Sequence, residues 1–205
     1  MNKYTNIAVL AILAAFSFTV PANADVISFD NLNATSVDAD SLAAVGPIAG
    51  SFSTSAFASK LSQVSFKLSG TADAGSVTVQ LLSDSSSSPG SVLGTIGTLS
   101  DSLLTGTLSN FTVIPSTTFN LLASTRYWIQ LVSNSSSANW AWSEDISGPG
   151  VAGQFIANTN GVFANSTEAP YQMQVLTIAP EPSYGILSFG ILGILFFATR
   201  KRRTA

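Results

Sequence analysis

The sequence predicts an all-β fold, an antiparallel β-sandwich of about eight or nine strands with a targeting segment at each end of the chain. Between the ends, apolar residues alternate with polar residues in short runs, as they do on half-buried strands. Clusters of Gly, Pro, Asn, Asp and Ser separate these runs, and no stretch has the period of a long amphipathic helix. Each end carries an uninterrupted apolar run, which predicts an N-terminal signal peptide and one C-terminal transmembrane helix.

Residues 1–24 have the order of a secretory signal peptide. Lys3 supplies a positive charge, and residues 7–20 form an apolar run of fourteen residues. Ala22 and Ala24 then occupy the small-residue positions of an A-x-A cleavage site. A short buried helix or an uncleaved anchor is the alternative, but the run is short for a membrane span. We expect cleavage after Ala24, and therefore export from the cytoplasm.

The mature chain is expected to form one ectodomain. Residues 25–47 are less regular and predict an edge strand at residues 26–29 followed by a loop. Residues 48–179 predict the body of the sandwich. Within it we expect Tyr127 in the core, whereas Trp128 points to the opposite face of the same strand, where it is either covered by a loop or half exposed. The clearest alternating runs are Val64-Phe66-Leu68, Val77-Val79-Leu81, Tyr127-Ile129-Leu131 and Tyr171-Met173-Val175.

Charge and composition argue against several classes of function. From Asp25 to Glu181, eleven acids face three basic residues, so this part has a net charge of −8 and a nucleic-acid partner is not expected. The chain has no Cys and no His, which removes disulfides, thiolate nucleophiles, Cys-ligated zinc and the Ser–His–Asp triad. No two acids have a spacing that predicts the carboxylate pair of a glycosidase. We therefore predict no enzyme activity and no catalytic residue.

Trp140 and Trp142 are the candidate ligand-binding residues of the ectodomain. They flank Ala141, so on a strand both rings lie on one face. If exposed, the two rings would form a platform on which a sugar ring can stack. If buried, they would be large core residues, because each aromatic ring removes much apolar surface from water. We expect burial rather than exposure.

Glu144 and Asp145 directly follow these aromatic residues and lead into a Gly-Pro-Gly turn. Two carboxylates in a turn are a weak candidate for Ca²⁺, which takes about six to eight oxygen ligands. The alternative is a solvated acidic loop, and this is what we expect. We therefore predict no metal site and no cofactor.

The C-terminal segment, residues 180–205, has three parts in order. A Pro-Glu-Pro motif is expected to be extended, because proline breaks helices and biases the preceding residue towards β conformations. Residues 184–199 carry no charge, and as a helix at ~1.5 Å per residue they reach about 24 Å, a little short of a ~30 Å hydrocarbon core. A basic cluster then holds that end on the cytoplasmic side. The residues concerned are Pro180, Glu181 and Pro182 in the motif, and Arg200, Lys201, Arg202 and Arg203 in the cluster.

This segment resembles the PEP-CTERM sorting signal of exported proteins in Gram-negative bacteria that make exopolysaccharide. The resemblance covers about 26 residues and includes the motif, the apolar run and the basic cluster in the family's order. It implies recognition in the inner membrane by exosortase, a membrane-embedded cysteine protease that removes the tail and passes the protein to the cell surface or matrix. An ordinary membrane anchor is the alternative.

The ectodomain resembles the choice-of-anchor R type of domain over about residues 48–179. The stretches that carry this resemblance are "VTVQLLSDSSSSPGSVLGT", "FNLLASTRYWIQLV" and "WAWSE". The family is a β-rich extracellular unit that occurs with interchangeable C-terminal anchors. It implies a fold and a location, and it brings no catalytic residues.

Two functions follow from these expectations. The first is a structural or interaction protein of the cell surface or the exopolysaccharide matrix. The second is a carbohydrate-binding module that recognises the matrix polysaccharide itself. The two differ in whether Trp140 and Trp142 are exposed together. The expected partners are the exosortase, the inner membrane and, for the second function, the exopolysaccharide.

Overall fold

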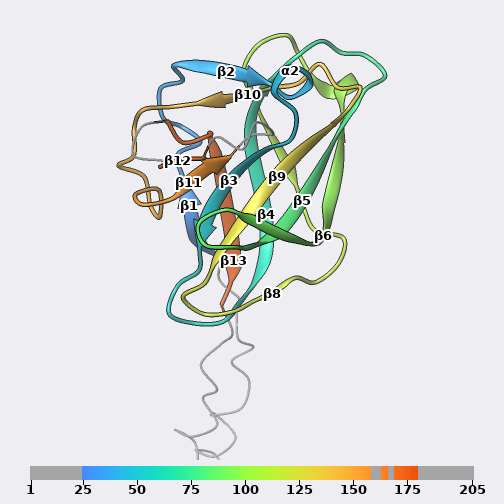
Figure 1. Cartoon of the computed structure of the whole chain (residues 1–205). Helices are drawn as coiled ribbons and strands as arrows, with labels where there is room; N and C mark the ends of the chain where they lie inside the picture. The colour runs from blue at the N-terminus through green and yellow to red at the C-terminus, as the bar shows by residue number, and fades with distance from the viewer. Residues whose placement is uncertain (1–24, 158–162, 166–168, 180–205) are drawn as a thin grey trace, which may run out of the picture. The chain divides into compact units, whose positions relative to one another are not determined.

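Two antiparallel sheets pack face to face in the structure, a computed structural model that describes residues 25–157, 163–165 and 169–179 (Figure 1). Apolar side chains from both sheets meet in one core cluster. The structure therefore confirms the all-β, antiparallel architecture that the alternation predicts. Within the described ranges, no helix has the length and apolar character needed to cross a membrane.

The first sheet has seven strands, and its longest member is β4 (Ser59–Ser69). The order across the sheet is β1, β13, β4, β10, β2, and the strands β7 and β8 also pair with β4. Strand β13 lies between β1 and β4, with Asp25 opposite Ile178. The start of the first strand and the end of the last therefore meet at one end of the sandwich. The other strands of this sheet are β1 (Asp25–Asp30), β2 (Asp38–Ser41), β7 (Ser109–Val113), β8 (Asn120–Leu121), β10 (Asn139–Trp142) and β13 (Met173–Ile178).

The second sheet has six strands in the order β12, β11, β3, β9, β5, β6. The long hairpin of β5 and β6 carries three irregularities in its register, and β6 forms one edge of the sheet. Two short helices, α2 (Leu42–Val45) and η1 (Asp101–Leu103), lie in connections between strands. The strands of this sheet are β3 (Ile48–Ser53), β5 (Ser76–Asp84), β6 (Pro89–Ser100), β9 (Arg126–Asn134), β11 (Phe155–Ala157) and β12 (Phe163–Asn165).

The described residues contain thirteen strands, more than the eight or nine that the sequence predicts. The difference comes from short strands. β2 and β10 have four residues each, β11 and β12 have three, and β8 has two. A run this short does not repeat the two-residue period often enough to be recognised in a sequence, and its pairing depends on longer neighbours.

The core shows why the alternating runs form strands. On β9, Tyr127, Ile129 and Leu131 are buried in the main cluster, whereas the intervening Gln130 is half-buried on the other face. Tyr127 stacks on Phe52 with ring centroids 5.9 Å apart. Its hydroxyl accepts a hydrogen bond from the Leu122 backbone N–H at 2.9 Å. The predicted core position of Tyr127 is confirmed.

The Gly-Pro-Gly turn after β10 packs directly against β1. The Asp30 backbone N–H donates to the Pro149 carbonyl at 2.9 Å. A Cβ atom on Gly148 would lie 1.9 Å from the Asp30 carbonyl oxygen, and one on Gly150 would lie 2.1 Å from the Ser28 carbonyl oxygen. Only glycine allows this close backbone approach. The turn therefore fixes the loop that follows β10 against the edge of the first sheet.

Candidate functional site

Trp140, the first residue of the predicted sugar platform, lies inside the sandwich. Its side chain has no exposed surface. Its ring stacks on Tyr171 at a centroid distance of 4.8 Å and meets the edge of Phe66 at 5.5 Å. The indole N–H donates to the Gln172 carbonyl at 2.9 Å, so the polar atom of the ring is satisfied within the core.

Trp142 packs against the same core cluster and is half-buried. Its backbone carbonyl accepts a hydrogen bond from the Val37 N–H at 3.0 Å. Trp140 and Trp142 therefore share a face, but that face is the core side of β10. The two rings do not form an exposed platform: Trp140 is buried, as the sequence favours, and Trp142 is half-buried. The physical reason is that β10 lies between β2 and β4, so its inner face meets the opposite sheet.

The sequence does not predict the polar contact beside Trp140. The buried Tyr171 hydroxyl donates to Oδ2 of Asp40 at 2.5 Å, across 131 residues of sequence. Burial, followed by the hydrogen bond and the charge of Asp40, raises the pKa of Tyr171 well above its ordinary value. Tyr171 therefore stays protonated as a donor at neutral pH. No local pattern links two residues so far apart, because their pairing depends on the register of β2 with β10.

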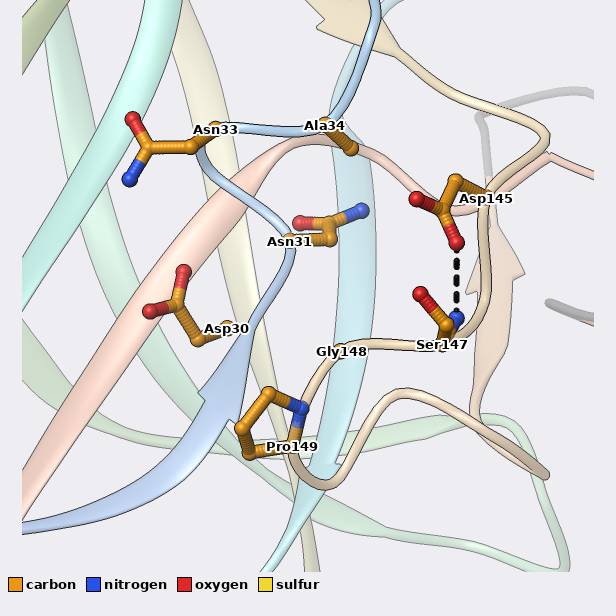
Figure 2. A pocket seen from close by; sticks show the side chains of 8 residues that line it. All are labelled: Asp30, Asn31, Asn33, Ala34, Asp145, Ser147, Gly148 and Pro149. Carbon is orange, nitrogen blue, oxygen red and sulfur yellow. Dashed lines mark hydrogen bonds between the residues drawn. The ribbon is translucent and has the colours of Figure 1, made fainter.

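A polar crevice of about 260 Å³ opens between the loop that follows β1 and the loop that follows β10. Figure 2 shows the Asp145 carboxylate and the Asn31 amide on two sides of it, with Gly148 and Pro149 at its base. The other lining residues are Asp30, Asn33, Ala34 and Ser147. Carboxylate and amide groups of this kind bind hydroxyl groups by hydrogen bonds.

The polar side chains of Asp30 and Asn31 hold the loop after β1 against β13 and against Pro170, which precedes that strand. Asn31 is buried; its amide donates to the Pro170 carbonyl at 3.4 Å, and its oxygen accepts from the Met173 N–H at 2.9 Å. The Asp30 carboxylate accepts from the Leu32 N–H and from the Gln174 side chain. These groups are satisfied by the fold, as buried polar groups generally are.

Asp145 is the exposed carboxylate of the crevice. It accepts a hydrogen bond from the Ser147 N–H at 2.8 Å (Figure 2). Hydrogen bonds from the Ser147 side chain and then from its backbone lower the pKa of Asp145 below its ordinary value. The group is therefore ionised at neutral pH and can accept further hydrogen bonds from a ligand in the crevice.

Glu144 and Asp145, the weak calcium candidate, do not both line the crevice. Asp145 lines the crevice, whereas Glu144 is exposed and does not line it. Within residues 25–157, 163–165 and 169–179, no three acidic side chains gather closely enough to hold a metal ion. Two carboxylates supply few of the oxygens that Ca²⁺ takes.

A second buried tryptophan lies on the other face of the six-stranded sheet. Trp128 has no exposed surface, and its indole N–H donates to Oδ1 of Asp84 at 2.8 Å. The cluster around it contains Ala49, Leu82 and Ala157, with Phe155 packed alongside. The sequence predicts that Trp128 faces away from the core, and the structure shows it fully buried there against side chains of β3, β5 and β11.

Arg126, on the same face as Trp128, ties three segments together. Its guanidinium carbon lies 4.6 Å from the centroid of the Phe155 ring. Nη1 donates to the Ser87 hydroxyl at 3.1 Å, and Nη2 donates to the Gly153 carbonyl at 3.2 Å. These contacts join the β5–β6 turn to the segment before β11 and give Arg126 a structural role.

The residues predicted for processing and sorting lie outside the described residues. These are the signal-cleavage residues Ala22 and Ala24, the sorting motif Pro180, Glu181 and Pro182, and the basic cluster Arg200, Lys201, Arg202 and Arg203. The apolar run of residues 184–199 also lies outside. For all of them the sequence remains the source of the assignment.

Comparison with known proteins finds solved structures that are similar to this chain but no matching protein family. No protein-family model matches the chain, and no curated protein matches it. The resemblances to the PEP-CTERM signal and to the choice-of-anchor R type of domain therefore stay predictions.

The chain is similar in structure to Cwp84, a clostridial cysteine protease, after propeptide cleavage. The TM-score is 0.54 at 14% identity, and the match covers 78% of this chain and 41% of that chain. A structure of the cysteine protease and lectin-like domains of Cwp84, a surface layer associated protein of Clostridium difficile, matches with a TM-score of 0.48 at 15% identity, over 65% of this chain and 32% of that one. The chain therefore spans less than half the length of these solved chains, and the first likeness shows that its fold occurs in a solved protein.

Proposed function

We propose that this chain is an exported β-sandwich protein that an exosortase-type protease sorts to the cell surface or the exopolysaccharide matrix, where it acts as a structural or interaction protein. The observation that carries the proposal is where the strands begin and end. β1 begins at Asp25, and β13 ends at Ile178. Cleavage after Ala24 and cleavage at the Pro-Glu-Pro motif would leave every described strand intact.

An enzymatic role finds no support in the side chains of this chain. A cysteine protease needs a thiolate nucleophile, usually activated by a base such as His, and the sequence contains neither Cys nor His. The protease activity of Cwp84 therefore does not carry over. The buried aromatic and polar groups described above stabilise the sandwich, which fits a protein whose function depends on its surface.

Intact mass spectrometry of the protein from surface and inner-membrane fractions tests the proposal. In wild-type cells we expect a mature form that begins at Asp25 and lacks the residues after the Pro-Glu-Pro motif. In cells without the exosortase, and in a variant with Pro180, Glu181 and Pro182 replaced by alanine, we expect the full tail in the inner membrane. Pro115→Ala, outside the motif, is the matched control and should be processed normally. Peptides from residues 184–199 in the wild-type surface fraction would contradict the proposal.

Carbohydrate binding is the second candidate function, and the polar crevice is the observation that favours it. Trp140 and Trp142 pack on the core, so they are not the candidate binding site. The candidate site is the crevice with its ionised Asp145 and exposed Asn33. Loss of a hydrogen bond to a charged group costs about 1.5–3 kcal/mol, roughly 10-fold or more in affinity. Asp145→Asn should therefore weaken binding of the purified protein to the host exopolysaccharide by this factor, whereas Asp73→Asn, in the turn after β4 and outside the lining of the crevice, should not. Equal affinities for the two variants and the wild type would remove this candidate.

A further inference from the structure

Two connections at one end of the sandwich present apolar side chains to solvent. Phe57, between β3 and β4, is 69% exposed, and Leu122, directly after β8, is 68% exposed. Their neighbours Ala56, Ala58 and Ala123 are exposed as well. We refer to residues 56–58 and 122–123 together as the apolar tip. Single exposed apolar residues are common on protein surfaces, but a cluster of them indicates a contact surface.

Hydrogen bonds hold the two halves of the apolar tip together. The Ser124 N–H donates to the Ser55 carbonyl at 2.7 Å. The Thr54 hydroxyl donates to the Leu122 carbonyl at 2.6 Å, and the Thr54 N–H donates to the Thr125 carbonyl at 3.0 Å. Phe57 and Leu122 are therefore presented from a fixed backbone frame.

The apolar tip lies at the end of the sandwich where the last strand finishes. Lys60 of β4 is opposite Asn120 on one side and opposite Ile178 on the other. Figure 1 shows β8 and the end of β13 at this same end of the domain. Five Cα–Cα steps join Ala179 to the start of the apolar run at residue 184, and five residues of extended chain span at most about 18 Å. A membrane that holds this run is therefore within reach of the tip.

Charged residues of both signs lie at this end: Asp25 is opposite Ile178, and Asp84 follows Ser83, which is opposite Tyr127. Lys60 is exposed beside the apolar tip. Asp40 is level with Leu68 through Trp140, and Asp73 follows the end of β4 at Ser69. β4 has eleven residues, so at about 3.3 Å per residue these acids lie roughly 30 Å from the tip. An anionic lipid surface attracts Lys60 and leaves Asp40 and Asp73 at a distance. Asp25 opposes this attraction, so the docking depends mainly on the apolar side chains of the tip.

We propose that the apolar tip docks on the lipid surface of the membrane that holds the apolar run of residues 184–199. Phe57 and Leu122 then enter the interfacial region, and Lys60 lies beside lipid phosphates. The proposal rests on the proposed function, because it needs the C-terminal segment to be membrane-bound before processing. It adds a defined orientation, in which the end of β13 faces the bilayer and the connection to the sorting motif is kept at the membrane surface.

Site-specific fluorescence in the full chain tests the docking. Because the chain has no Cys, Phe57→Cys, Leu122→Cys and Leu103→Cys each give one labelling site. Leu103 is the matched control, since it is 58% exposed but belongs to η1, next to the turn after β4. Each labelled chain is reconstituted into vesicles of phosphatidylethanolamine and phosphatidylglycerol, with and without a lipid that carries a quencher at headgroup depth. Flotation of the vesicles reports membrane anchoring separately.

We expect the chain to float, the labels at positions 57 and 122 to be quenched, and the label at position 103 to keep its intensity. Adding Leu122→Ser to the chain labelled at position 57 should shift it towards the undocked state by roughly 10-fold or more, because one large apolar side chain no longer enters the lipid. A chain that floats with unquenched tip labels overturns the docking while the anchoring stands. A chain that does not float overturns the anchoring and the docking with it. Tip labels that are shielded from water but not quenched by lipid would indicate contact with a second copy of the chain, which also overturns the proposal.

Discussion

Trp140 and Trp128 are both fully buried, yet they belong to different regions of the molecule. Trp140 lies between the two sheets, where Phe66 and Tyr171 contact its ring and a backbone carbonyl accepts its N–H. Trp128 lies on the outer face of the six-stranded sheet, in a small cluster made mainly of Ala49, Leu82 and Ala157, and its N–H bonds the Asp84 carboxylate. Equal burial therefore arises from aromatic packing in one place and from a covered outer face with a charged partner in the other.

The contribution of a buried tryptophan to the free energy of unfolding therefore depends on the groups that surround it. Trp140 is surrounded by large rings of the main core, so its removal leaves a cavity that neighbouring strands cannot close. Trp128 depends more on one hydrogen bond to a carboxylate, which is stronger than a neutral one. Substitutions that separate packing from hydrogen bonding distinguish the two regions.

Trp140→Ala should have the largest effect. We expect a loss of about 3–5 kcal/mol of unfolding free energy, against a total of ~5–15 kcal/mol for a domain of this kind. Chemical denaturation followed by circular dichroism measures it. Trp142→Ala is the control on the same strand and should cost less, because its ring is only partly buried. Similar losses for the two variants would contradict the difference in burial between these rings.

Trp128→Phe should have a smaller effect, about 1.5–3 kcal/mol, because it keeps an aromatic ring but removes the donor to Asp84. The same change at position 140 removes a donor to a neutral carbonyl, for which about 0.5–1.5 kcal/mol is expected. The loss of stability on removing the indole N–H should therefore be larger at position 128. The loss on removing the packed ring should be larger at position 140. If Trp140→Phe were the more damaging of the two, the charged partner would not distinguish the regions.

Tyr171→Phe should have the smallest effect at neutral pH, at the lower end of the ~1.5–3 kcal/mol range for a bond to a carboxylate, since the ring that stacks on Trp140 is kept and Asp40 is only half-buried. Its signature is a change in pH dependence. Because the folded state raises the pKa of Tyr171, the unfolded chain ionises first, near pH ~10, and stability falls as the pH rises above that value.

Denaturation of the wild type and Tyr171→Phe between neutral and strongly alkaline pH checks this sign. Below about pH 10 the difference between the two should be constant, and above it the wild type should lose its advantage. Tyr127→Phe serves as the control, because Tyr127 is also buried but its hydroxyl accepts from a backbone N–H. A pH-independent difference for Tyr171→Phe would show that ionisation of this hydroxyl does not contribute.

The fold class was predictable because long strands repeat their pattern. β4, β5 and β9 are nine or more residues long, and the alternating apolar residues within them form much of the main core. The short strands β2, β8 and β11 were not predictable, since a few residues show no period and their position depends on neighbours that are distant in sequence. The sequence leaves open whether the outward face of Trp128 is covered or half exposed, and the structure buries it against side chains that include those of the three-residue β11.

The candidate sites were less predictable than the fold. Spacing correctly places Trp140 and Trp142 on one face of a strand, but only the sheet order determines that this face meets the core. The crevice joins Asp30 and Asn31 to Asp145, more than a hundred residues later, and the hydrogen bond from Tyr171 to Asp40 crosses a similar distance. Local patterns contain no information about such contacts, because the register of strands brings them together.

The position of β13 between β1 and β4 has a mechanical consequence. Tension applied through the C-terminal segment acts on a strand that is hydrogen-bonded on both sides along most of its length. Such a load shears two ladders at once, whereas tension through Asp25 acts on β1, which within the described residues has a strand ladder only with β13 and meets the Gly-Pro-Gly turn on its other side. We expect single-molecule pulling from the C-terminal side to need a higher force than pulling from Asp25, with the other attachment point at the opposite end of the sandwich in both cases. Equal unfolding forces would show that the second ladder of β13 adds no mechanical resistance. For a protein tethered by its C-terminus, the strand nearest the tether would then be the one best able to withstand the drag of a surface or matrix.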